Sequence, residues 1–380
     1  MTDAGQHVKS SYLPGIDLAK LFVMFTIVCA HIMDGGLFPL AYDAHPVLSR
    51  FVFYFLYCLF AGLTVYALAT GYLLINSKGR YSRLLSLWVQ MVFTGLVVTV
   101  VLKATGLVEI SFKDFTTVFR PLSSKCWWYM SSYFIVAILA PLLNEGIRRV
   151  PRQRLEMLFL VAFPLICISE FFTKKGFVVI EHGFCADWLL LLYVLGAYLR
   201  LYQPFRNLKP RVCFAAVLVI VTLTSGVDAF VPTLNVPFLT KVFGNFRYYD
   251  LASPSILLMG VFLFTGFCNL KIENPRVVKA LKFLSPAILG VYLIHFQPFL
   301  WKRCLKPILP SLNLDSLGLA LLVVFGGGFV VFFVCLALDL LRVRLFDLLR
   351  VNARVESVCE RISAIFFKRN DSSADCEHRP

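Results

Sequence analysis

The sequence predicts an all-α, polytopic membrane protein with about ten transmembrane helices and both termini on the cytoplasmic side. Hydrophobic residues make up 59% of the 380 residues and charged residues only 16%, whereas a soluble domain is about half apolar and a quarter charged. The apolar residues also gather in runs of roughly 17–25, which is long enough for a helix to cross a hydrocarbon core of about 30 Å.

The predicted spans follow these runs along the chain. They lie at 16–33, 51–75, 84–102, 127–144, 155–173, 186–202, 212–230, 251–269, 283–301 and 316–341. The first run follows a polar stretch and carries two charged residues, so we expect a retained helix and not a cleaved signal peptide. Residues 1–341 therefore form one membrane domain. Residues 342–380 are predicted to form a cytoplasmic amphipathic helix on the inner leaflet, followed by a disordered tail.

Lysine and arginine set the predicted orientation, because they are in excess in cytoplasmic loops. With the N-terminus inside, 25 of the 37 Lys and Arg residues fall on the inner side. We expect a multi-pass protein of the inner (plasma) membrane, with the lipid bilayer as a partner. Topology and anionic lipid account for the net charge of +15, so no nucleic-acid partner is expected.

The eleven cysteines predict neither a disulfide framework nor a metal centre. Most lie within spans, where cysteine behaves as a small apolar residue. Cys126 and Cys185 fall near the outer face, and a disulfide between them stays open. No CxxC pair and no metal-type Cys/His spacing occurs, so no metal ligands are predicted.

Two histidines lie deep within predicted spans, where an ionisable group is costly and marks a candidate functional site. His31 lies 14 residues beyond Asp17, which is roughly 21 Å along a helix axis and places it in the outer half of the membrane. His295 reaches a similar level in the ninth span. The sequence therefore predicts that both histidines converge on one outer level. The alternative for each is a neutral histidine that is hydrogen-bonded to a neighbour and has only a structural role.

Charged residues at the inner face are candidates for binding an anionic donor. Asp17 and Lys20 are three residues apart, so they share a helix face and can pair. Arg80 and Arg83 lie between the second and third spans, and arginine makes bidentate contacts with phosphate. Simple anchoring of the first helix and the positive-inside rule are the alternatives for these two pairs.

Aromatic and acidic residues at the outer face are candidates for binding a carbohydrate. Trp127, Trp128 and Tyr129 open the fourth span, with Tyr133 one turn deeper, and Asp250 precedes the eighth span. A rim of this kind suits a sugar. An ordinary aromatic belt and a generic wet loop are the alternatives.

Four motifs in this order resemble the acyltransferase-3 family, and more narrowly its branch that O-acetylates cell-surface polysaccharides. They are IDLAK followed by His31, then RYSRLL, then WWYMSSYFIVAILAPLLN, and finally LGVYLIH, and together they cover roughly residues 12–303. The resemblance implies an enzyme that takes acetyl-CoA from the cytoplasm as co-substrate, with no permanently bound cofactor. Its acceptor would be a hydroxyl of a carbohydrate or lipid-linked glycan at the outer face.

The resemblance also implies roles for individual residues. His31 matches the catalytic histidine of the first helix, and His295 matches the histidine of the YLIH motif. Lys20 stands where many members have arginine, and Tyr133 falls near a glutamate of a common relative. Arg80 and Arg83 match the basic pair implicated in binding the donor's phosphates. By their positions alone, we expect Asp17 beside Lys20 at the donor, and Trp127, Trp128, Tyr129 and Asp250 at the acceptor.

The expected chemistry follows from the weak nucleophilicity of a sugar hydroxyl. A neutral imidazole is suited to remove its proton, so we expect His31 to act as a base while the hydroxyl attacks the thioester. His295 or Tyr133 would stabilise the oxyanion or orient His31. A covalent acetyl-histidine is the mechanistic alternative, and a ten-helix transporter or flippase is the alternative function.

Overall fold

The computed structural model describes residues 12–37, 46–60, 62–77, 81–123, 127–172, 180–243, 248–312, 314 and 316–374. These residues contain helices and no strand, which confirms the predicted all-α class. The longer helices are α1 (Pro14–Ile32), α3 (Pro46–Phe60), α4 (Leu63–Leu74), α5 (Tyr81–Ala104), α7 (Trp128–Arg149), α8 (Arg152–Phe172), α9 (Ala186–Tyr202), α10 (Pro210–Phe230), α12 (Pro254–Cys268), α13 (Pro275–Leu284), α17 (Gly328–Leu348) and α18 (Val351–Ala374). The shorter ones are α6 (Phe112–Val118), α11 (Pro237–Phe243), α14 (Ile288–His295), α15 (Lys306–Ile308) and α16 (Leu317–Leu322).

Eight helical segments in the described part of the chain are long and apolar enough to cross a membrane. All ten predicted spans are helical, but α9 has only 17 residues and α12 only 15. At 1.5 Å per residue these helices measure roughly 26 and 22 Å, less than a hydrocarbon core of about 30 Å. Ten helices are therefore present where they were predicted, and eight of them meet the length for a full crossing.

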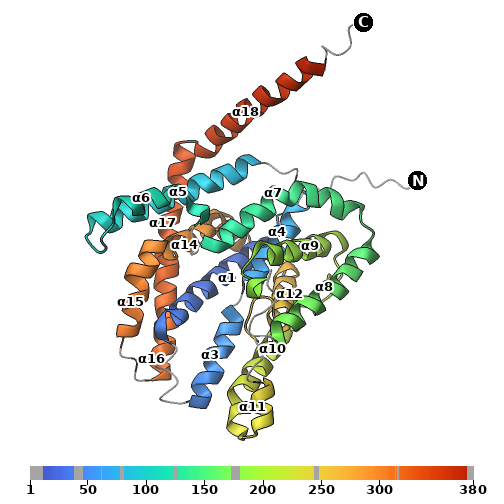
Figure 1. Cartoon of the computed structure of the whole chain (residues 1–380), viewed down its shortest axis with the longest axis vertical. Coiled ribbons are helices and arrows are strands. Elements are labelled where there is room, and N and C mark those ends of the chain that lie inside the picture. Colours follow the sequence, from blue (N-terminus) through green and yellow to red (C-terminus); the bar gives the residue numbers. More distant parts are fainter. Residues whose placement is uncertain are drawn as a thin grey trace.

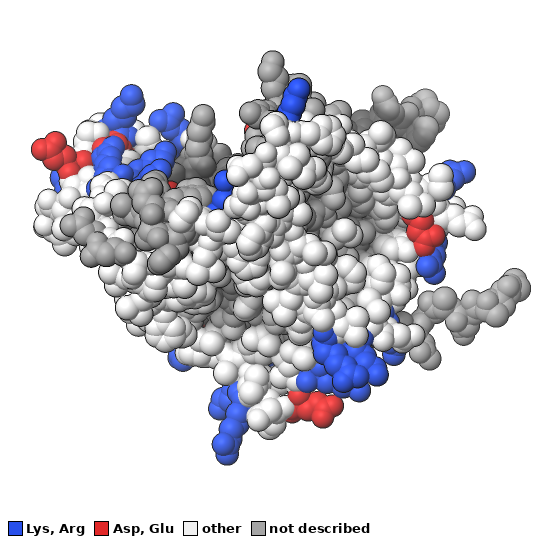
Figure 2. All heavy atoms as spheres, turned by 90° about the horizontal axis from the view of Figure 1, so that it is seen from below, with Lys and Arg blue, Asp and Glu red and all other residues white. Residues whose placement is uncertain are grey.

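Large apolar side chains cover the outward faces of the long helices. Leu142 on α7, Leu160 on α8 and Leu341 on α17 are each about two-thirds or more exposed (73%, 68% and 67%). In the view of Figure 2, Lys and Arg gather in small groups toward the edges and uncharged residues cover most of the remaining described surface. Such a surface is suited to contact lipid tails, so the protein is a multi-pass membrane protein.

Helix α1 lies at the centre of the bundle and positions the candidate site. It packs against α3, α12, α14 and α17 (Figure 1), and Val23, Val28 and Cys29 are fully buried. A helix that is apolar on all sides can be enclosed in this way. The π-helical turn Met33–Leu37 continues α1 directly beyond the histidine that it carries.

Helices α4 and α9 cross closely because both have a glycine at the contact. A Cβ atom on Gly71 would lie 2.0 Å from the Tyr193 carbonyl oxygen, and one on Gly196 would lie 2.2 Å from the Leu68 carbonyl oxygen. Small residues at such contacts let two backbones approach within a membrane. This crossing holds α4, which forms one wall of the site, against α9.

Helix α18 projects away from the bundle (Figure 1). It occupies the region where an amphipathic helix was predicted, but it continues to Ala374 and includes residues 370–374, which the sequence placed in a disordered tail. No Gly or Pro interrupts this stretch, so nothing local breaks the helix. Residues 375–380 lie outside the described residues. Contact of α18 with the inner leaflet stays a prediction.

Candidate active site

The two deep histidines meet, as their predicted depths suggest. Nδ1 of His31, near the end of α1, lies 2.9 Å from Nε2 of His295, the last residue of α14. Nδ1 of His295 lies 2.6 Å from the carbonyl oxygen of Val291, one turn back in the same helix. His295 is 1% exposed, so its imidazole is held entirely by protein contacts.

These two contacts fix the tautomers of a neutral histidine pair. A carbonyl oxygen only accepts a hydrogen bond, so Nδ1 of His295 carries a proton and donates to Val291. Nε2 of His295 then has a lone pair and accepts from Nδ1–H of His31. The remaining nitrogen of His31, Nε2, is left with its lone pair. We call this hydrogen-bonded chain, from His31 through His295 to the Val291 carbonyl, the relay. Its tautomers follow from the hydrogen-bond network and leave the lone pair of His31 Nε2 available to accept a proton.

His31 lines a cavity of about 390 Å³. The ring of Phe296 stacks on the His31 imidazole, with centroids 3.9 Å apart and ring planes at 12°. This contact restricts rotation of the imidazole in the cavity wall. The other lining residues are largely aromatic or charged and include Asp34, Tyr66, Trp128, Tyr129, Phe184, Tyr292, Trp301, Lys302 and Lys306. A base thus faces a pocket with stacking surfaces and charged groups, within the size range of small-molecule sites.

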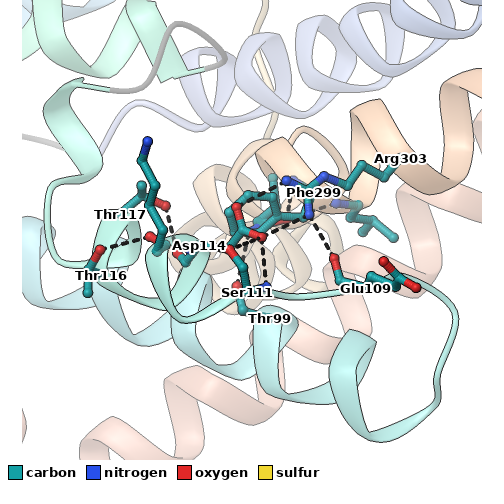
Figure 3. Close-up of polar contacts among 11 residues, drawn as sticks. Thr99, Glu109, Ser111, Asp114, Thr116, Thr117, Phe299 and Arg303 are labelled. Atoms are coloured by element: carbon teal, nitrogen blue, oxygen red, sulfur yellow. Dashed lines mark hydrogen bonds and ion pairs between the residues drawn. The ribbon is translucent and has the colours of Figure 1, made fainter.

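A polar cluster holds the wall segment that follows His295 (Figure 3). Arg303 forms a bidentate ion pair with Asp114 of α6, with both N–O distances 3.0 Å, and also donates to the Glu109 carbonyl oxygen. Asp114 in turn completes the capping box with Ser111 at the start of α6. The hydrogen bond from Arg303 lowers the pKa of the Asp114 carboxyl to about 2. This cluster fixes the π-helical turn Leu300–Leu305, which carries two residues of the cavity wall.

Gln297 fixes the start of the same segment. Its side-chain oxygen accepts hydrogen bonds of 2.8 Å from the backbone N–H groups of Phe299 and Leu300, and its amide nitrogen lies 3.3 Å from the Thr99 hydroxyl on α5. Gln297 is 1% exposed. The chain therefore leaves α14 along a path determined by hydrogen bonds at both ends of the π-helical turn.

Two further cavities continue the first one toward α5. The middle cavity, about 260 Å³, includes Lys20 and Tyr133 in its lining, and it shares Tyr66, Tyr129 and Leu289 with the histidine cavity. The inner cavity, about 60 Å³, includes Arg83 and shares Leu74 and Tyr133 with the middle one. The three cavities therefore adjoin in series, and side chains common to two cavities separate each from the next.

Two of the four predicted donor residues line these cavities, Lys20 the middle one and Arg83 the inner one. Lys20 Nζ lies 3.2 Å from Asp17 Oδ1, so the predicted pair forms, and the Tyr12 hydroxyl donates to the other Asp17 oxygen at 2.9 Å. Arg83 lines the inner cavity. Arg80 lies outside the described residues. The binding roles of these residues stay predictions.

Tyr133 lies farther from the histidines than the sequence suggested. Tyr129, four residues earlier on α7, separates the histidine cavity from the middle cavity, whereas Tyr133 lines only the middle and inner ones. One more helical turn carries Tyr133 toward Arg83. The hydrogen-bond partner of His31 is His295, so the geometry gives Tyr133 no part in orienting the base.

The predicted acceptor residues divide into two groups. Trp128 and Tyr129 line the histidine cavity. Trp127 is the N-cap of α7 and has a non-helical backbone conformation; its side chain is 2% exposed and packs near Gly95 of α5. Asp250 does not line this cavity. Its carboxylate lies 3.1 Å from Nδ1 of His182.

Several cavity residues were not predicted from the sequence. Tyr66, Phe296 and Trp301 lack any motif that sets them apart from the many other aromatic residues. Adjacency to His295 was the one available signal, and it would have found Phe296. Cys126 lies outside the described residues, and Cys185 has a free thiol that caps the start of α9 through Trp188 N–H.

Comparison with known families gives the class of this protein. A family model described as an acyltransferase domain, that of the acyltransferase-3 family, matches residues 13–340. The chain belongs to the acyltransferase-3 family. No curated protein and no solved structure matches the chain. As an acyltransferase-3 protein with membrane-spanning helices, it is a membrane acyltransferase, so an acyl donor and an acceptor must meet at its site. Within this acyltransferase-3 domain, the histidine cavity holds a base of the kind that acyl transfer to a hydroxyl needs.

Proposed function

We propose that this membrane acyltransferase moves an acetyl or other short acyl group from cytosolic acetyl-CoA to a hydroxyl of a cell-surface carbohydrate or lipid-linked glycan. The observation that carries the proposal is the His31–His295 relay at the wall of the first of three adjoining cavities. The base lies in the cavity with aromatic walls, and the cationic residues Lys20 and Arg83 lie in the cavities beyond it. A donor that displaces the side chains shared by adjoining cavities would reach His31 from the inner side, and the acceptor would reach it from the outer side.

The donor would enter from the inner face. Arg83 lines the inner cavity of about 60 Å³ and would bind a phosphate of the donor's nucleotide. The nucleotide itself is too large for this cavity and would remain outside the protein. The narrow pantetheine arm would extend through the middle cavity past Lys20. Along α1, Lys20 and His31 are 11 residues apart, or roughly 16 Å, a distance that an extended pantetheine arm is suited to cover.

The acceptor would occupy the histidine cavity. Trp128, Trp301 and Phe184 offer flat faces on which the apolar side of a sugar ring can stack. The cavity volume of about 390 Å³ lies within the usual range of about 300–1,000 Å³ for small-molecule sites. We infer that one or two sugar units enter, while the rest of a glycan stays outside.

The transfer step uses the free nitrogen of the relay. His31 Nε2 takes the proton of the acceptor hydroxyl as its oxygen attacks the thioester carbonyl carbon, giving a tetrahedral intermediate. The carbon–sulfur bond then breaks, the ester forms, and the leaving thiolate takes the proton from His31 to give free CoA. His295 receives the hydrogen bond from His31 throughout and favours the imidazolium that forms transiently. Both of its nitrogens are engaged, so His295 is a positioning residue and does not bind the oxyanion.

Release of free CoA thiol from acetyl-CoA, measured on the purified full chain in nanodiscs with a panel of glycans, tests the proposal. His31→Ala should lose roughly 10²-fold or more of the activity, the typical contribution of a general base, and should still bind acetyl-CoA. Arg83→Ala should raise the KM for acetyl-CoA. Arg154→Ala, an exposed arginine at the start of α8, is the matched control and should leave KM unchanged.

Binding of acetyl-CoA gives a second readout that needs no acceptor. A ligand that binds the folded protein raises its melting temperature, and this shift should be smaller in Arg83→Ala than in Arg154→Ala. Absence of a shift with any short acyl-CoA would exclude the acyl-CoA donor. A shift without transfer to any hydroxyl would leave the donor and refute the carbohydrate acceptor.

A further inference from the structure

Three side chains that can bind a metal ion converge outside the histidine cavity. Nδ1 of His182 lies 2.7 Å from Oε2 of Glu170 and 3.1 Å from Oδ2 of Asp250, and the three atoms lie within 4.8 Å of one another. The Glu170 side chain is completely buried, Asp250 is 15% exposed and His182 is 25% exposed. The cluster is therefore enclosed by protein on one side and reachable from solvent on the other.

The three residues come from separate segments of the chain. Glu170 lies in the last turn of α8, His182 lies in the 3₁₀ turn Glu181–Gly183, and Asp250 lies in the turn before α12. The spacings of 12 and 68 residues match no metal-binding motif, which explains why the sequence predicted no metal ligands. Only the fold brings them to one point.

We propose that Glu170, His182 and Asp250 form a zinc site. One imidazole and two carboxylates are a mixed nitrogen and oxygen ligand set that suits zinc, and water can supply a fourth ligand. A tetrahedral ion about 2.1 Å from each ligand atom holds neighbouring ligand atoms about 3.4 Å apart. The two distances to His182 fall short of this by less than about 1 Å, and all three ligand atoms lie within 4.8 Å of one another, so modest side-chain adjustments would admit the ion.

Two carboxylates this close favour a cation between them. A zinc ion among the three ligand atoms would bring two positive charges to this point. It would bind the imidazole of His182 through the lone pair of Nδ1, the nitrogen that faces both carboxylates.

The proposed ion would stabilise the turn at the edge of the histidine cavity. Glu181 and His182 both have positive φ (45° and 58°), a conformation that costs a residue other than glycine free energy. Gly183 has φ 91°, and a Cβ atom there would lie 2.6 Å from the Leu251 Cβ, so this turn packs tightly on the segment after Asp250. Phe184 follows directly and lines the histidine cavity. Zinc would hold the turn, and with it Phe184, in place.

Metal content and melting temperature of the full chain in nanodiscs, prepared without a polyhistidine tag, test the site. After chelation and dialysis against buffered zinc, the wild type should retain one zinc ion per chain more than Glu170→Gln or His182→Gln. Glu181→Gln is the matched control, since it removes an exposed carboxylate one residue from His182, and it should retain the ion. Zinc should raise the melting temperature of the wild type and Glu181→Gln, and not that of Glu170→Gln.

The wild type and its three variants have the same cysteines. A difference in zinc content among these four proteins therefore reports on the proposed site and not on zinc bound by cysteine. Glu170→Gln keeps the shape of the side chain, so a loss of zinc in this variant, if it still melts cooperatively, cannot be assigned to misfolding. Equal zinc content in wild type and Glu170→Gln would overturn the proposal. Neither readout involves acyl transfer, so the result stands apart from the proposed function.

Discussion

Replacement of His295 by leucine tests the relay most directly. Leucine fills a similar volume at a site that is 1% exposed, but it cannot accept the hydrogen bond that Nδ1–H of His31 donates over 2.9 Å. His31 then loses the partner that fixes its tautomer and its ring orientation. His295→Gln supplies the comparison, because an amide oxygen near the position of Nε2 can still accept that bond.

The size of the effect follows from the cost of an unmade hydrogen bond. The imidazolium that forms on His31 in the transition state would lose a hydrogen bond to a charged group, which is worth about 1.5–3 kcal/mol. At 1.36 kcal/mol for each tenfold change in rate, kcat of His295→Leu should fall about 10- to 150-fold. His295 lines none of the three cavities, so the KM values of donor and acceptor should stay nearly constant. His295→Gln should lose less activity than His295→Leu.

The assay is release of free CoA thiol under saturating donor, with the melting temperature of each variant as a check on folding. A His295→Leu enzyme that folds and keeps the wild-type kcat would refute the relay, since His31 would then need no partner. A raised KM with unchanged kcat would instead make His295 a substrate-binding residue. Equal loss in the leucine and glutamine variants would show that the accepted hydrogen bond is not what matters.

Further predictions concern the rim and the helix packing. Arg303 lowers the pKa of the Asp114 carboxyl to about 2. The stability that this carboxylate contributes is therefore present above its ordinary pKa of about 4 and is lost as the pH falls toward 2. The difference in melting temperature between wild type and Asp114→Asn should shrink from pH 5 to pH 3. Gly196→Ala should lower the melting temperature by several degrees, because its Cβ would lie 2.2 Å from the Leu68 carbonyl oxygen, whereas Gly146→Ala, with nothing within 4 Å, should not. Lys20→Ala should raise the KM for acetyl-CoA without changing the KM for the acceptor, which two-substrate kinetics measures.

The membrane architecture was predictable because it rests on composition over long windows. Each of the ten predicted spans coincides with one or more helices, and errors arise where a local break interrupts an apolar run. The second span is two helices, α3 and α4, and α12 is shorter than the apolar run that contains it. Hydropathy does not distinguish a short helix enclosed by others from one that crosses the bilayer alone.

The meeting of His31 and His295 was predictable for a similar reason. Helix rise converts sequence position into depth, so two ionisable residues at one depth were expected to lie near one another. Depth alone does not give the direction in which a side chain points. Trp127 and Trp128 have nearly the same depth, yet one packs in the core and the other lines the cavity. Asp250 was assigned to the acceptor by its outer position, whereas the fold turns it toward His182.

Three π-helical turns surround the outer end of α1, and they explain why the cavity wall could not be foreseen. One follows His31 directly (Met33–Leu37), one carries Trp301 and Lys302 (Leu300–Leu305), and one precedes α17 and packs against α1 (Val323–Gly327). A π-helical turn widens the helix and rotates every later side chain away from its α-helical position, and such turns often occur at functional sites. The periodicity of 3.6 residues therefore assigns the wrong faces beyond each turn. Trp301, in the second of these turns, lies at a ring centroid distance of 5.7 Å from His31, so one of the irregular turns carries a residue of the cavity wall that lies beside the base.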